Sequence, residues 1–217
     1  MRFGRIEYLN LLPFHIFMKR YLRVSRSQMM LRHGANVPSA INRAYRARKI
    51  DAAFISSIRA KGQKHLNLGI IADGPVQSVL LIPSESPQTD TASETSNALT
   101  RVLGLEGRVI IGDPALRAYL EGVEALDLAE EWHKRYGLPF VFGLLSYQGN
   151  EKQMRRLGRA FARRPQKIPQ YLLKRAAART GVRPQDILAY LEGIHYRMDH
   201  RALRSLRLFW RLAEQVR

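Results

Sequence analysis

Short apolar segments alternate with amphipathic segments along the first two-thirds of the chain. Apolar runs typical of strands occur at residues 2–9, 28–31, 51–55, 67–72, 77–82, 108–111 and 140–144. Between them, apolar residues recur at helical spacing at residues 13–22, 37–48, 95–103 and 125–136. Because strands and helices alternate, the pattern predicts an α/β fold with mostly parallel sheets.

The last third of the chain has a different pattern. Beyond residue 150 the apolar spacing is helical throughout, with breaks at Pro165, Pro169 and Gly193. The last helix is predicted to start after Asp199 as its N-cap and to bury Phe209 and its neighbours. A second N-cap is predicted at residues 112–114, where Gly-Asp-Pro would place Pro at the first helical position.

Charge divides the chain into three parts. Residues 1–82 hold 14 basic and 3 acidic side chains, a balance of +11, and residues 151–217 hold 17 and 5, a balance of +12. Residues 83–150 hold 5 basic and 10 acidic side chains, a balance of −5. Because the two ends resemble each other and the middle differs, the pattern indicates a middle segment inserted into a unit built from both termini.

Composition excludes several classes of protein. The 217 residues are 46% hydrophobic, enough to bury a core. With no Cys, the chain has no disulfide framework and no thiolate metal site. No apolar run approaches the roughly 20 residues that span a bilayer, and residues 1–10 lack the apolar core of a signal peptide. We therefore expect a cytoplasmic protein without a membrane span.

Polar residues just after the predicted strands are the first candidates for a site, because ligands of open α/β sheets bind there. Asn10, Ser56 and Ser57 directly follow strands. Two further groups are candidates as well: Gln77 and Ser78 at the turn between two strands, and Ser93, Thr95 and Ser96 at the start of a helix. Hydroxyls and backbone N–H groups at a helix start suit an anion. The same residue types are also ordinary N-caps, so both interpretations stay open for each of them.

Other chemistry finds little support. The six His show no spacing typical of metal ligands, and no P-loop, G-x-G-x-x-G or G-x-S-x-G motif is present. The net charge of +18 suggests nucleic acid, but no nucleic-acid-binding motif accompanies it. We expect neither a metal nor a specific nucleic-acid partner.

A set of motifs resembles one known family. YLNLLPF, KIDAAFISSI, ADGPVQSVLL, TASETSNAL, IGDPAL and DLAEEWHKRYGLPFVFGL occur in this order between about residues 5 and 145. Together they resemble the chorismate dehydratase family of the futalosine route to menaquinone. The segment between TSNAL and IGDPAL is shorter here than is usual in that family.

The resemblance implies a cytoplasmic enzyme with a periplasmic-binding-protein type II fold, in which two α/β lobes enclose a ligand cleft. Residues 1–82 and 141–217 would form one lobe, and residues 83–140 the inserted lobe. This division agrees with the charge pattern.

The resemblance also implies the reaction and its residues. The family removes water from chorismate, a small dicarboxylate, to give 3-[(1-carboxyvinyl)oxy]benzoate, without a cofactor, and a carboxylate of the substrate itself takes the proton. By motif position, Asn10 and Ser78 would be catalytic. Ser56 and Ser57 would bind one carboxylate, and Ser93, Thr95 and Ser96 the other, with Gln77 beside them.

Two alternatives have the same fold. One is a non-catalytic binding protein for small anions, against which the lack of a signal sequence argues. The other is the naphthoate synthase of the same pathway, against which the YLN and GPVQSVLL motifs argue. The sequence leaves open whether the protein is a monomer or a homodimer.

Overall fold

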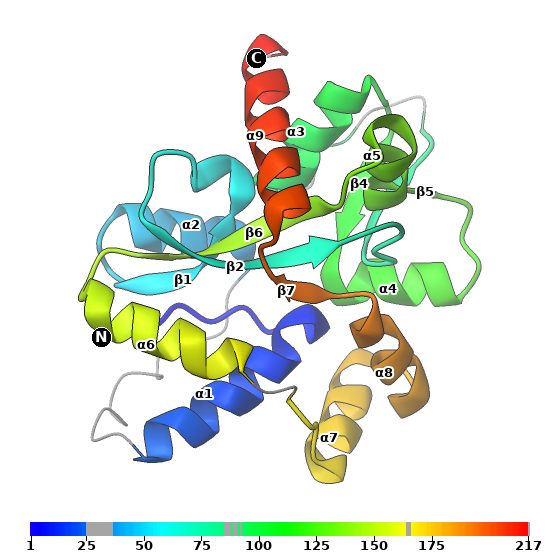
Figure 1. Cartoon of the computed structure of the whole chain (residues 1–217). Helices are drawn as coiled ribbons and strands as arrows, with labels where there is room; N and C mark the ends of the chain where they lie inside the picture. The colour runs from blue at the N-terminus through cyan, green and yellow to red at the C-terminus, as the bar shows by residue number, and fades with distance from the viewer. Residues whose placement is uncertain (25–36, 85–87, 89–90, 92, 164–165, 217) are drawn as a thin grey trace.

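Two β-sheets form the framework of the protein (Figure 1). The computed structural model describes residues 1–24, 37–84, 88, 91, 93–163 and 166–216. The larger sheet has the strand order β1-β6-β2-β7, made by Ala52–Ser56, Phe140–Tyr147, His65–Ala72 and His195–Arg197. The smaller sheet has the order β4-β3-β5, made by Arg108–Ile111, Val79–Ile82 and Leu126–Asp127.

The strand pairing corrects the expectation of mostly parallel sheets. All strand pairs among the described residues are antiparallel, and parallel contacts occur only as isolated bridges, Phe3 with Ala52 and Gln88 with Arg108. The chain leaves the larger sheet after β2 and returns in β6, which inserts between β1 and β2. β6 runs opposite to both of its neighbours, so its pairings with β1 and with β2 are both antiparallel.

The N-terminal segment is also different from its prediction. Residues 2–9 were expected to form a strand, yet only Phe3 pairs with the sheet, and the chain then turns into a short 3₁₀ helix. The strand predicted at residues 28–31 lies outside the described residues. The division into two lobes at residues 82 and 140 stays a prediction.

Helices cover both faces of the larger sheet. Figure 1 shows α1 and α6 below it and α9 above it. The bounds of the helices are η1 Leu9–Leu11, α1 Leu12–Val24, α2 Pro38–Arg46, η3 Ser57–Arg59, α3 Glu94–Leu103, α4 Gly112–Leu120, α5 Leu128–Tyr136, α6 Glu151–Ala162, α7 Gln170–Thr180, α8 Pro184–Glu192 and α9 His200–Gln215. Within the described ranges, no helix is long and apolar enough to cross a membrane.

Three local predictions need correction, and one is confirmed. The helix expected at residues 125–136 is preceded by β5, and Asp127 caps it by accepting hydrogen bonds from the N–H groups of Ala129 and Glu130. Asp113 lies in the first turn of α4 instead of capping it, because α4 begins at Gly112 with Ile111 as its N-cap. The C-terminal third contains β7 as well as helices. Asp199 caps α9 as predicted.

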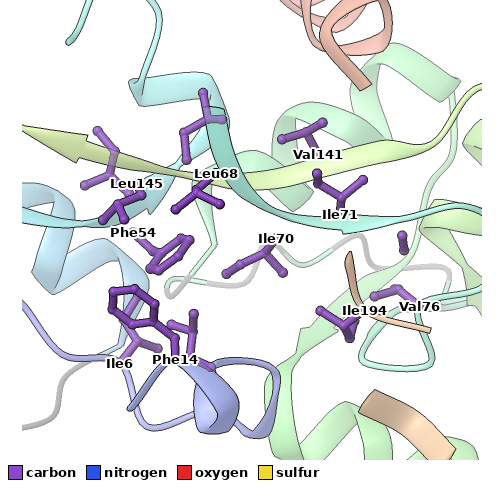
Figure 2. Packing of buried hydrophobic residues seen from close by; sticks show 14 of the residues in the cluster. Ile6, Phe14, Phe54, Leu68, Ile70, Ile71, Val76, Val141, Leu145 and Ile194 are labelled. Atoms are coloured by element: carbon purple, nitrogen blue, oxygen red, sulfur yellow. The ribbon is translucent and has the colours of Figure 1, made fainter. Parts of the chain in front are cut away.

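Aromatic side chains hold the N-terminal segment and the sheet together. Figure 2 shows Ile6 and Phe14 lying beneath Phe54 of β1. The ring of Phe14 meets those of Phe54 and Phe161 edge-on, at centroid distances of 5.0 and 5.1 Å. Such pairs add about 1 kcal/mol each beyond the burial of apolar area. This packing fixes where the chain enters η1, next to the candidate site.

Candidate functional site

A cleft of about 580 Å³ lies between the two sheets. Its walls are mostly apolar and come from β1, β2 and β6 on one side and from β3 and β4 on the other. Its polar side chains are Asn10, Ser56, Ser78, Ser93 and Ser96. The fold thus brings five of the eight candidate residues to one cleft, although they are up to 86 positions apart in the sequence.

Asn10 has an unused acceptor. It lies in η1, and its backbone carbonyl accepts a hydrogen bond from the Tyr196 hydroxyl at 2.5 Å. Its side-chain Oδ1 is buried and has no hydrogen-bond partner among the described residues. Because a buried acceptor without a partner costs free energy, this oxygen is suited to a ligand that carries a hydroxyl or N–H donor.

Ser78 is held by a buried tyrosine. Its hydroxyl lies 2.8 Å from that of Tyr190, and its backbone carbonyl accepts the N–H of Gly112 at 2.8 Å. Burial raises the pKa of Tyr190, so its hydroxyl stays protonated at neutral pH. The pair is therefore a fixed source of neutral hydroxyl hydrogen bonds at the cleft wall.

The sequence analysis did not find Tyr190 and Tyr196. Tyr190 occupies an apolar-face position of α8 together with Ile187, so its spacing indicates only a core residue. Tyr196 lies in β7, a strand that the sequence pattern does not reveal. Neither position carries a local signal of function.

Ser56 belongs to a hydrogen-bonded group with Asn42. The Ser56 N–H donates to Asn42 Oδ1 at 3.0 Å, and Asn42 Nδ2 donates to Ser56 Oγ at 2.8 Å. The same Nδ2 lies 3.2 Å from Glu94 Oε1 at the start of α3. These contacts fix the Ser56 hydroxyl at the end of β1.

Ser93 and Ser96 form the N-terminus of α3 at the other wall. Ser93 is the N-cap, and its Oγ accepts the Ser96 N–H at 3.1 Å. The Ser93 hydroxyl also donates to Ser96 Oγ at 2.7 Å. The positive end of the α3 dipole thus lies at the cleft.

The other three candidates lie outside the residues that line the cleft. Ser57 Oγ is 3.4 Å from Thr95 Oγ1, which also accepts the N–H of Ile58 at 3.3 Å. Gln77 has a positive φ of 61°, and its N–H donates to Asp127 Oδ2 at 2.6 Å. These contacts join separate elements of the fold, and a role in binding stays a prediction for all three.

Charged groups stand behind the cleft wall. Asp113 is largely buried and accepts the N–H of Leu9 at 2.9 Å, which anchors η1 next to Asn10. Arg179 pairs with the same carboxylate at 2.8 Å. Burial raises the pKa of Asp113, and the Leu9 N–H and Arg179 oppose that shift. Within the described ranges, no Lys, Arg, Asp or Glu lines the cleft itself.

No group of three or more His, Asp or Glu side chains that could hold a metal ion is found within the part of the chain that the structure describes.

Solved structures with low sequence identity share the fold. A protein of Archaeoglobus fulgidus matches with a TM-score of 0.70 at 12% identity, covering 99% of this chain and 96% of its own. The periplasmic aliphatic sulphonate binding protein of Escherichia coli matches with a TM-score of 0.56 at 14% identity, covering 99% of this chain and 85% of its own. A Candida albicans protein with the generic periplasmic binding protein fold has a TM-score of 0.57 at 11% identity, with 99% and 90% covered. The chain therefore has the periplasmic-binding-protein-like fold that was expected.

Sequence comparisons show the family. Residues 1–108 and 102–215 match the protein family described as Menaquinone biosynthesis. A chorismate dehydratase of Campylobacter jejuni is 40% identical over 199 residues, which are 90% of this chain and 89% of the relative. Both matches extend over nearly the whole chain, and the resemblance found in the motifs is confirmed. The chain belongs to the chorismate dehydratase family of menaquinone biosynthesis.

Proposed function

We propose that the protein is a hydro-lyase that converts chorismate to 3-[(1-carboxyvinyl)oxy]benzoate and water. The observation that carries the proposal is the buried Oδ1 of Asn10, which has no partner among the described residues and lines the same cleft as Ser78. The cleft also combines mostly apolar walls with a few polar side chains, as sites for small ligands commonly do.

The reaction removes one proton from C3 of the ring and the hydroxyl from C4. The C3–H electron pair forms a new ring double bond as the C4–O bond breaks, so the ring becomes aromatic and one water is released. Aromatisation supplies the driving force. The enzyme therefore needs mainly to orient the substrate and to stabilise the departing hydroxide.

The base in this proposal is a carboxylate of the substrate. The enolpyruvyl carboxylate is tethered to C3 through the ether oxygen, which brings it near the proton that leaves. A cation bound to it would lower its pKa and weaken it as a base. Because uncharged groups line the cleft, this carboxylate would keep its basicity.

Each cleft residue has a part in the proposed mechanism. In the complex with substrate, Asn10 Oδ1 would accept a hydrogen bond from the C4 hydroxyl. As the C4–O bond breaks, Asn10 Nδ2 would donate a hydrogen bond to the departing oxygen. The Ser78 hydroxyl, held by Tyr190, would hold the reacting end of the substrate. The α3 N-terminus with Ser93 and Ser96, and Ser56 across the cleft, would bind the carboxylates.

Turnover of chorismate tests the proposal directly. The purified protein is incubated with chorismate, and the aromatic product is identified by chromatography and mass spectrometry. We expect stoichiometric product, and Ser78→Ala should lower kcat by about tenfold or more. As a matched control, Ser84→Ala removes a hydroxyl outside the cleft and should leave kcat unchanged. No product across a range of pH values would contradict the proposal.

A further inference from the structure

A second hollow lies against the N-terminal segment, on the side of α1 and α7. It is open to solvent, has a volume of about 840 Å³, and its basic side chains are Arg5, His15, Lys19, Arg175 and Arg179. We call it the basic pocket. Figure 1 places α1 and α7 at the end of the molecule opposite to the C-terminus of α9. Tyr8 lines both the cleft and the basic pocket, so the two hollows are neighbours.

The acidic groups near the basic pocket do not balance its charge. Glu7 lines it and pairs with Arg5 at 2.6 Å, and Asp113 pairs with Arg179 at 2.8 Å. Lys19 and Arg175 form no ion pair with a described residue. Two cations at the pocket are thus left for an anion from solution.

Arg5 supplies a second, independent sign of a missing ligand. Its Nε is buried and has no hydrogen-bond acceptor among the described residues. A buried N–H donor without an acceptor is costly, and native structures seldom retain one. An anionic oxygen in the pocket would supply the acceptor.

His15 lies buried next to the cations of the basic pocket. Burial, together with Arg5, Arg179 and Lys19, lowers the pKa of its imidazole from 6.5 to about 3. The ring is therefore neutral at physiological pH and retains one N–H donor for an anion.

Apart from Glu7, which pairs with Arg5, the rest of the lining is mostly apolar and selects the kind of anion. Leu12 and Ile16 of α1 and Leu172 and Ala176 of α7 line the pocket, together with Tyr8. A bare inorganic oxyanion would leave this surface uncovered. A flat apolar body with carboxylates at its edge would cover the surface and reach the cations at the same time.

We propose that the basic pocket binds a small aromatic dicarboxylate, at a site separate from the cleft. The site uses Lys19 and Arg175 as the free cations and Arg5 as an additional donor. It accounts for part of the basic charge that the dehydration reaction does not use. The proposal does not depend on the reaction in the cleft.

Isophthalate (benzene-1,3-dicarboxylate) is the probe for the test. It is added at constant low ionic strength while NMR follows the imidazole Cε1–H resonance of His15, which His15→Gln assigns. We expect a saturable shift. Lys19→Glu/Arg175→Glu should weaken binding by about tenfold or more, because both free cations are reversed.

Two control proteins separate this site from general charge and from the cleft. Arg204→Glu/Arg207→Glu makes the same change in net charge on exposed positions of α9 and should keep the affinity within about twofold. Asn10→Ala alters the cleft and should leave unchanged the affinity for isophthalate that is measured at the His15 resonance. Lys19→Ala/Arg175→Ala, checked by circular dichroism, replaces the reversal variant if that variant is misfolded.

Three results would overturn the proposal. One is a His15 shift that does not saturate. Another is an equal loss of affinity in the two charge-reversed double variants, which would mean only general attraction of anions. The third is a shift produced equally well by inorganic phosphate at matched ionic strength, which would mean that the apolar lining has no part in binding.

Discussion

The cleft and the basic pocket are neighbours at Tyr8, and they differ completely in charge. The polar side chains of the cleft are an amide and hydroxyls, whereas the basic pocket is lined by four Lys or Arg side chains. The comparison teaches that a net charge of +18 does not mark the place of the proposed chemistry. A dianionic substrate that supplies its own base is better held by neutral donors, because a paired cation would weaken that base.

Placing a charge in the cleft is the strongest way to break this contrast. Asn10→Asp replaces the amide by a carboxylate of similar shape, which would repel the proposed dianionic substrate and lose the Nδ2 donor. We expect kcat/KM for chorismate to fall by about a hundredfold or more.

The matched control is Asn67→Asp, the same chemical change at an exposed position of β2. It should leave the kinetics unchanged, since Asn67 does not line the cleft. Retention of activity by Asn10→Asp within about threefold would mean that the neutral cleft is not needed for turnover.

Tyr8 lies between the cleft and the basic pocket, and a substitution at Gly112 tests how tightly its ring is packed. This glycine has a φ of +71°, and an added Cβ would lie 2.7 Å from the Tyr8 ring. Gly112→Ala should therefore lower the free energy of unfolding by about 2 kcal/mol, from backbone strain and from the displaced ring.

Gly122→Ala separates these two causes. Gly122 has a φ of +76°, but an added Cβ there would have no atom within 4 Å. Its loss should be about 1 kcal/mol, measured by urea denaturation. Equal losses in the two variants would show that displacing the Tyr8 ring costs no stability, so that the ring is not tightly packed against Gly112.

The basic pocket should make stability depend on pH through His15. Its pKa is lowered from 6.5 in the unfolded chain to about 3 in the folded one. As pH falls below 6.5 the unfolded state binds a proton that the folded state does not, so stability falls toward pH 3. Because the side chain is partly exposed, we expect a loss of about 1 kcal/mol between pH 7 and pH 5.

Replacing this ring isolates its contribution. In His15→Gln, the loss of stability between pH 7 and pH 5 should be smaller by about that amount, measured by denaturant unfolding at both pH values. His195→Gln, at an exposed position of β7, is the control and should keep the wild-type dependence. An unchanged pH dependence in His15→Gln would mean that burial and the surrounding cations do not lower the pKa of this ring.

The sequence predicted the fold class better than the strand pairing. Most strands and helices follow from local apolar spacing, whereas the inserted middle segment that the reversal of charge suggests stays a prediction. Two of the antiparallel pairings depend on β6, a strand placed between β1 and β2, both of which precede it by more than 60 residues. Local patterns contain no information about such a long-range insertion.

Local sequence patterns also predicted part of the candidate site. Asn10, Ser56, Ser78, Ser93 and Ser96 lie at or next to the ends of strands and helices, and the structure brings them to one cleft. Their supports come from elsewhere: Tyr190 and Tyr196 lie more than 100 positions along the chain. A buried tyrosine that fits an apolar helical face cannot be distinguished from core by its spacing.

Tyr190 provides the smallest and most specific test of the cleft. Tyr190→Phe removes only the hydroxyl that lies 2.8 Å from Ser78 Oγ. Because a neutral hydrogen bond contributes about 1 kcal/mol, we expect kcat to fall about fivefold with KM nearly unchanged. Tyr171→Phe, on a side chain that is 70% exposed, should have no effect.

A double-mutant cycle decides whether Tyr190 acts through Ser78. If it does, Tyr190→Phe should cost almost nothing further in a Ser78→Ala background, since the hydroxyl that it positions is already gone. Additive losses in kcat would instead mean that the Tyr190 hydroxyl contributes independently of Ser78. A purely structural role would lower the stability of Tyr190→Phe without the selective fall in kcat. Either result would replace a positioning pair at the neutral wall by two unrelated groups.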